Sequence, residues 1–166
     1  MRLADGPTTE VDVHIDAPAD VVWSYVSDID LPARFSSELN GARWLDGVTA
    51  PALGARFQGS SRHDAVGEWE TTCVVTVWEP ERSFAWAVGD PTNPAAVWRF
   101  DLTRHGEGVR LRQWAQLGPG PSGLTPAIEA MPDKEERIIA RRLSEHRANM
   151  EATVNGIKSV AEAAAR

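Results

Sequence analysis

The chain contains only one cysteine, Cys73, so it can form no disulfide bond within itself. Proteins without a disulfide framework are typical of reducing compartments, and we expect a cytoplasmic location. Residues 1–9 are polar and lack the apolar run of a signal peptide. No segment approaches the roughly 20 consecutive apolar residues that a membrane span requires, so no integral membrane association is expected.

Basic residues are also fewer than acidic residues. The 166 residues include 17 lysines and arginines against 24 aspartates and glutamates, which gives a formal net charge of -7. A nucleic-acid partner would require a basic face that displaces counterions from phosphate groups. An anionic membrane surface would repel the chain, because both carry negative charge. The charge therefore argues against both partners and favours a monomer or a homodimer.

The motifs of several common enzyme classes are missing as well. The four histidines, His14, His63, His105 and His146, are scattered without the spacing of a metal site. The sequence has no GxSxG nucleophile motif, no P-loop and no dinucleotide-binding fingerprint. We therefore expect neither a metal ion nor a cofactor.

Tryptophan, by contrast, is abundant, with seven residues against one tyrosine. Apolar and polar residues alternate in several stretches, as where Val11, Val13 and Ile15 follow Glu10, Asp12 and His14. This period of two is typical of a strand with one buried face. Glycine and proline separate the stretches at the short spacing of an antiparallel meander. Strands are predicted over residues 10–15, 42–45, 55–62, 68–78, 83–88, 95–103 and 109–117.

Helical patterns occupy the rest of the chain. A helix is predicted over residues 18–27, and residues 31–39 form a second short helix or a loop. A much longer helix is predicted from Asp133 to Ala165, with an apolar row that recurs every three or four residues. This row must be buried, and only the concave face of the sheet is large enough to cover it. We therefore predict an α+β helix-grip fold, a curved antiparallel sheet of about seven strands wrapped around the long C-terminal helix, with two short helices after the first strand.

Several motifs carry a resemblance to a known family. Residues 17–23 read APADVVW directly after the first predicted strand, residues 69–75 read WETTCVV, and residues 79–86 read EPERSFAW. In this order they resemble the START/Bet v 1-like (SRPBCC) superfamily and, within it, the polyketide cyclase/dehydrase-like group. The resemblance implies a single helix-grip domain over residues 1–166 with an internal cavity, and we expect residues 1–8 and 162–166 to be flexible. It leaves the function open, because lipid carriers, hormone receptors and cyclases share the superfamily.

The alternation along each strand also assigns an inner face to the sheet. On this face we expect aromatic and aliphatic side chains, a few neutral polar groups, and no Asp, Glu, Lys or Arg. An uncharged, flat, apolar ligand fits such a surface, because burying an unpaired charge is costly. The predicted ligand-binding residues are Phe35, Phe57, Ser61, Trp69, Thr71, Trp86, Trp98, Phe100, Gln113, Leu143, His146 and Met150.

The leading functional prediction is binding of a small hydrophobic molecule in this cavity, for carriage or sensing. A lipid or a polyketide-like aromatic compound is the expected ligand. The alternative is an enzyme, a polyketide aromatase/cyclase or dehydratase in which His146 acts as a general acid or base. The sequence does not decide whether the chain is an enzyme.

Some of these residues also have a simpler interpretation. Trp69, Trp86 and Trp98 either form the walls of a cavity or fill the core and leave no cavity. His146 is either a catalytic group or a hydrogen-bonded core histidine. Cys73 is expected to be a small core hydrophobe without an activated thiolate.

Two further expectations concern the surface. Arg141 and Arg142 are predicted to belong to the solvated face of the long helix. Residues 31–39 and 118–123 are predicted to cover the opening of the cavity as lids.

Overall fold

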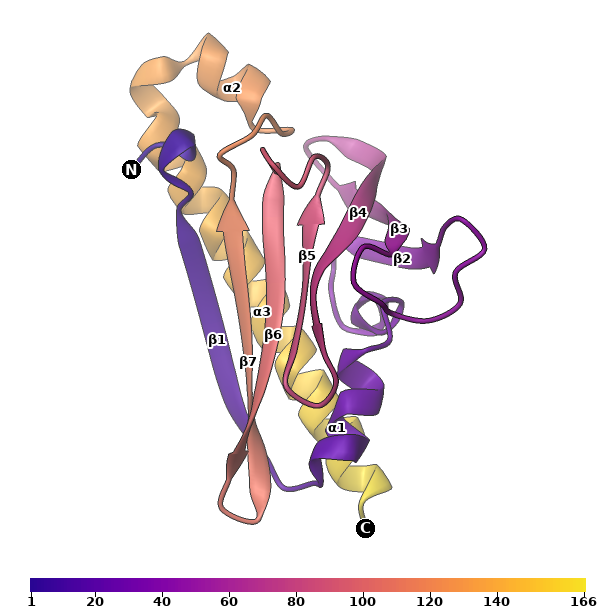
Figure 1. The fold of residues 1–166 in the computed structure, drawn as a ribbon. Coiled ribbons are helices and arrows are strands. Elements are labelled where there is room, and N and C mark those ends of the chain that lie inside the picture. The colour runs from indigo at the N-terminus through magenta and orange to yellow at the C-terminus, as the bar shows by residue number, and fades with distance from the viewer.

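The computed structural model describes residues 1–166 and contains one sheet of seven antiparallel strands. The spatial order of the strands is β1-β7-β6-β5-β4-β3-β2, so β1 pairs with the last strand of the meander (Figure 1). The predicted α+β helix-grip fold is confirmed. The strands are β1 (Thr8–Ile15), β2 (Leu39–Trp44), β3 (Arg56–His63), β4 (Gly67–Glu79), β5 (Ser83–Val88), β6 (Ala96–His105) and β7 (Gly108–Leu117).

The helices follow the predicted order. Three short 3-10 helices lie at Leu3–Asp5, Leu31–Arg34 and Pro132–Lys134. The second short helix after β1 is the one at Leu31–Arg34, where sequence patterning left a choice between helix and loop. None of the helices combines the length and the apolar character needed to cross a bilayer. The α-helices are α1 (Ala19–Val26), α2 (Thr125–Ala130) and α3 (Glu135–Ala164).

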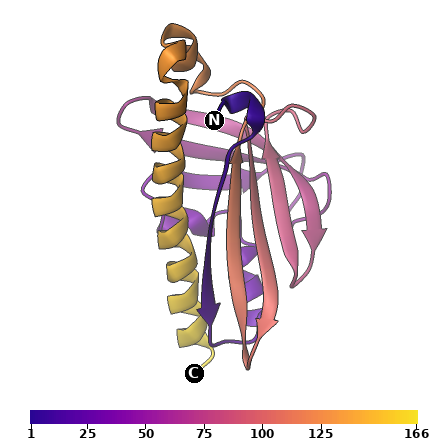
Figure 2. The ribbon, with the colours of Figure 1, turned by 90° about the vertical axis from the view of Figure 1, so that its left-hand side faces the viewer.

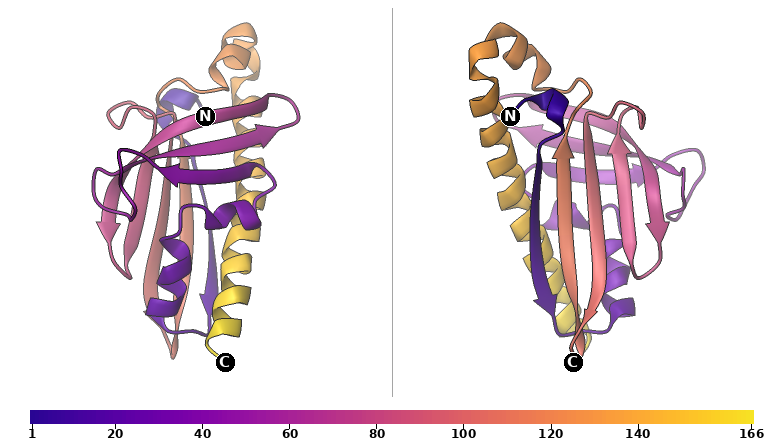
Figure 3. Two further views of the ribbon diagram at one scale, coloured as in Figure 1. Left: turned by 90° about the vertical axis from the view of Figure 1, so that its right-hand side faces the viewer. Right: turned by 60° about the vertical axis from the view of Figure 1, so that its left-hand side comes forward.

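The long helix α3 is the element around which the sheet bends. It has 30 residues, so at 1.5 Å per residue it is about 45 Å long. Its apolar row is buried, with Ile139, Met150, Val154 and Ile157 almost free of solvent contact. In Figures 2 and 3, β1 and β7 run along the helix whereas β2 and β3 cross it. The sheet thereby covers the apolar row from more than one side.

A β-bulge in β4 contributes to this bend. The register between β4 and β5 shifts between Val75 and Val77, which agrees with the break in alternation that Trp78 causes in the sequence. The Trp78 ring then packs against Trp23 of α1, at 5.5 Å between centroids, and against Phe84 of β5, at 5.3 Å. These rings fill the end of the molecule near α1, and the free space lies toward the other half of the sheet.

Candidate functional site

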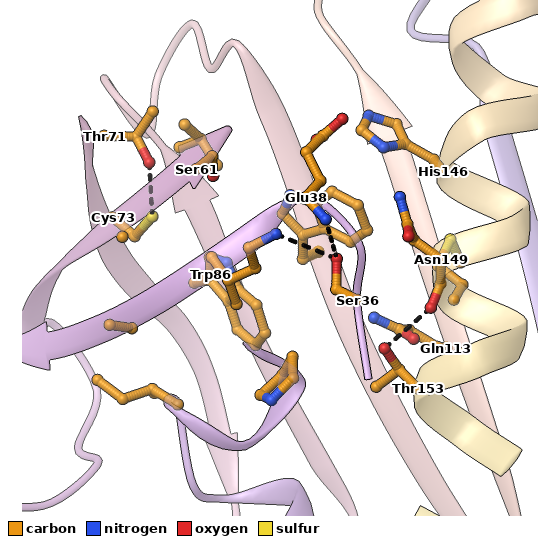
Figure 4. A pocket seen from close by; sticks show the side chains of 18 of the residues that line it. Ser36, Glu38, Ser61, Thr71, Cys73, Trp86, Gln113, His146, Asn149 and Thr153 are labelled. Carbon is orange, nitrogen blue, oxygen red and sulfur yellow. Dashed lines mark hydrogen bonds between the residues drawn. The ribbon is translucent and has the colours of Figure 1, made fainter. Parts of the chain in front are cut away.

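A cavity of about 140 Å³ lies between the concave face of the sheet and α3 (Figure 4). Its walls come from β2 to β7, from α3 and from the segment around the 3-10 helix at Leu31–Arg34. The alternation of strand side chains brings most of the predicted ligand-binding residues to these walls. Those that line the cavity are Phe57, Ser61, Thr71, Trp86, Trp98, Gln113, His146 and Met150.

The other predicted residues lie outside the walls, each for a physical reason. Phe35 packs on α3 at Gly156, where its ring takes the space of the missing Cβ. Trp69 pairs with Ser61 further along the β3–β4 hairpin and is only half-buried. Phe100 is 1% exposed within the main core. Leu143 packs against a separate small apolar cluster of Leu3, Leu117 and Ile139.

Sequence patterning missed several polar groups at the cavity. Asn149 and Thr153 of α3 line it together with His146. Their spacing of three and seven residues from His146 places them on the same helical face, a signal that was available in the sequence. Ser36 and Glu38 also line the cavity, from a segment without periodicity. Glu38 corrects the expectation that no charged residue faces the interior.

His146 is a buried titratable group at the cavity. Its side chain makes an edge-to-face contact with Trp98, at 4.8 Å between ring centroids. Burial, with a further contribution from the positive charge of Arg142, lowers the pKa of His146 to about 3. The imidazole is therefore neutral at pH 7 and offers one donor and one acceptor.

The only cysteine also faces the cavity. Cys73 is buried, and its sulfur lies 3.9 Å from the Thr71 hydroxyl oxygen. Burial raises the pKa of the thiol to about 12, so almost no thiolate is present at neutral pH. Cys73 therefore contributes apolar surface and no nucleophile.

An ionic network stands beside the cavity. Arg142 of α3 donates two hydrogen bonds to the Glu38 carboxylate, at 2.6 and 2.8 Å, and a third to Glu145 at 2.9 Å. His63 of β3 contacts Glu145 at 3.2 Å. The Arg142 and Glu38 side chains are only 17% and 15% exposed. The prediction that Arg142 belongs to a solvated face is wrong, because its guanidinium is held by Glu38 and Glu145, whereas Arg141 is exposed as expected.

This network resembles a metal site only in composition. Glu38, His63 and Glu145 offer ligand atoms that all lie within 4.8 Å of one another. The Arg142 guanidinium, however, already donates to both carboxylates. It supplies the positive charge that a metal ion would bring, and the cluster is an ion-pair network in this structure.

The network and its neighbours hold the segment 35–39 against α3. Besides the Glu38–Arg142 pair, the backbone N–H and the hydroxyl of Ser37 both donate to Asn149, at 3.0 and 2.9 Å. Phe35 adds the apolar contact at Gly156. This segment is part of the predicted lid 31–39, and its polar anchors are concentrated on one face of α3.

Replacing Gly156 by alanine tests whether the Phe35 ring packs directly against this position of α3. In an open helix position this change stabilises a protein by about 1 kcal/mol. Here a Cβ atom would lie 2.5 Å from Phe35 Cγ, so the ring must move. We expect a net loss of about 1 kcal/mol in the free energy of unfolding, measured by urea titration. The control is Asn155→Ala on the exposed face of the same turn, and stabilisation by Gly156→Ala would contradict this packing.

Comparison with known proteins decides the family. The family model for polyketide cyclase/dehydrase and lipid transport proteins matches residues 7–151. The chain belongs to this family. The match spans β1 to the middle of α3. It therefore includes every residue that lines the cavity except Thr153.

Solved structures of other proteins share the fold of this polyketide cyclase/dehydrase family member. The Polyketide_cyc-like protein Cgl2372 from Corynebacterium glutamicum is 28% identical, with a TM-score of 0.66 over 99% of this chain and 94% of that one. The di-domain ARO/CYC BexL from the BE-7585A biosynthetic pathway is 16% identical, with a TM-score of 0.70 over 96% of this chain and 51% of that one. Ara h 8.0201 is 10% identical, with a TM-score of 0.56 over 92% and 98%. No curated protein matches the chain.

Proposed function

We propose that this protein binds a small, uncharged, hydrophobic molecule in the cavity, for carriage or sensing. The observation that supports this most is the cavity itself, which stays open although Trp86, Trp98 and Phe57 are all part of its wall. A fold that served only as a scaffold would gain stability by filling this space with side chains. The family description, which includes lipid transport, agrees with a binding role.

The volume restricts the size of the ligand. An apolar cavity of about 150 Å³ accommodates benzene, whereas pockets for drug-sized molecules measure roughly 300–1,000 Å³. At about 140 Å³ the cavity fits a single ring or a short chain. A longer lipid or a multi-ring polyketide requires the segment 35–39 to move away from α3.

The walls restrict the charge of the ligand. The only ionised side chain among them is Glu38, and Arg142 already neutralises it. An anionic ligand would meet the Glu38 carboxylate without a free cation to pair with. A cationic ligand would need to compete with Arg142, so an uncharged molecule has the lowest desolvation cost.

The second candidate is a cyclase or dehydratase activity. It is favoured by the family description and by the similarity in fold to the ARO/CYC protein BexL. The candidate acid/base residue gives it less support, because the pKa of His146 lies near 3 and the imidazole is a weak base at neutral pH. Incubating a bound compound with the protein and following it by NMR separates the two functions, since only an enzyme changes the compound.

A direct test of binding is native mass spectrometry of freshly purified protein. We expect an added mass that corresponds to a small uncharged molecule and that disappears on mild denaturation. A preparation that carries no such mass, and that takes up no aromatic probe at millimolar concentration, would contradict the proposed function.

A cavity-filling variant gives the matched mutational test. Ser61 lines the cavity, whereas its neighbour Arg62 is exposed on the other face of β3. We expect Ser61→Phe to abolish uptake of a single-ring probe, because the new ring occupies its volume, and Arg62→Phe to leave uptake unchanged. Thermal shift with increasing probe measures both, and equal uptake by the two variants would place the binding site elsewhere.

A further inference from the structure

We propose that the ligand presents a hydroxyl group to the side-chain amide of Gln113, which makes single-ring phenols the ligand class of this cavity. This inference depends on the proposed binding function and adds the functional group of the ligand. It is carried by an unpaired buried group, by the chemistry of that group, and by the aromatic walls around it.

Gln113 lies at the middle of β7. The residue is 5% exposed and lies at the cavity, with its backbone paired to Phe100 of β6 and Val11 of β1. Its Oε1 atom is fully buried and is the one buried side-chain oxygen or nitrogen without a hydrogen-bond partner. Buried polar groups are nearly always paired, because an unpaired one keeps its desolvation cost without compensation. This oxygen has no surface open to the cavity, whereas the amide nitrogen does, so a ligand relieves the cost only once the amide has rotated by a half-turn and brought Oε1 to the cavity side.

A second polar group with unused capacity faces the same space. His146 lines the cavity from α3, and its ring nitrogens, which make no hydrogen bond within the chain, are not closed off as Oε1 is. Figure 4 shows Gln113 and His146 on the α3 side of the cavity, with Thr71 and Cys73 on the opposite side. Gln113 and His146 therefore lie on the same side of the cavity, and a ligand with a single polar substituent can direct it toward this side.

The amide selects a hydroxyl over other substituents. A hydroxyl both donates and accepts, so it can accept from the amide nitrogen as the side chain stands or, after rotation of the amide by a half-turn, donate to the amide oxygen. A carbonyl only accepts and leaves Oε1 unpaired. A methyl group pairs with neither atom. A carboxylate is excluded by its charge beside Glu38, which lines the same cavity.

The remaining walls select the ring. Phe57 and Trp86 meet edge to face at 5.6 Å between centroids, and Trp98 adds a third aromatic surface. Aromatic side chains favour planar aromatic partners in offset or edge-to-face contact. Together with the volume of about 140 Å³, this gives one aromatic ring that carries one hydroxyl.

The test compares phenol with toluene in the unaltered protein, by NMR or calorimetric titration. Toluene places a methyl group where phenol has its hydroxyl and is the more apolar of the two, so a purely apolar cavity prefers toluene. We expect phenol to bind at least about 10-fold more tightly, because toluene leaves the amide unpaired. Benzaldehyde, a carbonyl probe, is expected to bind more weakly than phenol.

The outcomes separate the inference from the function on which it depends. Toluene binding that equals or exceeds phenol binding would overturn the role of the hydroxyl while the binding function stands. Benzaldehyde binding that equals phenol binding would overturn the choice of a hydroxyl over a carbonyl. If none of the three probes binds, both the inference and the proposed function fail.

A substitution at Gln113 tests whether its amide causes the preference for phenol over toluene. Gln113→Leu removes the unpaired group at nearly constant size, so we expect a higher unfolding midpoint together with a reversed preference, toluene over phenol. The matched control is Gln116→Leu on the same strand, where the amide donates to the Gly118 carbonyl oxygen at 2.9 Å, outside the cavity walls. A Gln113→Leu protein that keeps the preference for phenol would overturn the assignment. The comparison of probes in the unaltered protein decides the ligand class even if this variant does not fold.

Discussion

Lowering the pH from 7 to 4 is expected to cost the folded protein about 3 kcal/mol through His146 alone. In the unfolded chain this histidine takes up a proton at its ordinary pKa of 6.5, whereas burial keeps it neutral in the folded protein until about pH 3. Between these two values the unfolded state binds more protons than the folded state. The stability that the neutral His146 permits is thus fully present above pH 6.5 and is lost as the pH falls toward 3.

The measurement is urea unfolding of the unaltered protein and of His146→Gln at pH 7, 5.5 and 4. Several carboxylates with lowered pKa values, among them Glu145 and Glu162, also lose stabilising contacts in acid, but both proteins share this loss. We therefore expect the difference between the two proteins to move by about 3 kcal/mol in favour of His146→Gln at pH 4. His105→Gln, on the surface, serves as the control. A difference that is the same at all three pH values would mean that the imidazole is not held neutral.

Removing the charge of Arg142 is the second change with a large expected effect. Arg142→Met leaves the carboxylates of Glu38 and Glu145 side by side without their shared cation. Breaking one side of a buried ion pair costs 3–5 kcal/mol, and the partial exposure here places the expected loss near the lower end, at about 3 kcal/mol. Urea unfolding at pH 7 measures it.

The adjacent arginine offers a matched control. Arg141 contacts the same Glu145, at 3.4 Å, but its side chain is 80% exposed. Arg141→Met is expected to change the stability by less than about 0.5 kcal/mol. The double variant Glu38→Gln/Arg142→Met is expected to recover part of the loss, since it removes one of the unpaired charges. Equal effects of the two single arginine changes would show that Arg142 is solvated, as its position in the sequence suggested.

Periodicity in the sequence predicted the elements of this fold and most of the walls of the cavity. The alternation in β3, β5 and β6 is regular. Once one residue of such a strand is assigned to the inner face, every second residue along the strand is assigned to it as well. This is how Phe57, Trp86 and Trp98 were assigned to the interior. The spacing of three and four residues in α3 likewise predicted His146 and Met150, whereas Asn149 and Thr153 flank this row, each one residue before Met150 and Val154.

The parts that sequence reasoning did not reach depend on contacts between distant segments. Glu38 and Arg142 are 104 residues apart, and nothing in either local sequence reveals that they meet. Phe35 lies in a segment without periodicity, and its position is set by the missing side chain of Gly156 on another element. Such pairings arise from the way the sheet bends around α3, which local patterns do not encode.

A protein of the proposed function admits a small uncharged ring into the space between the sheet and α3. Intermolecular NOEs between benzene and the methyl groups of the protein test it most directly, since Val88 and Met150 line the cavity whereas Leu53 and Val66 are exposed. We expect NOEs from benzene to the methyl groups of Val88 and Met150 and none to those of Leu53 and Val66. NOEs confined to the exposed methyl groups, or no NOEs at millimolar benzene, would contradict it.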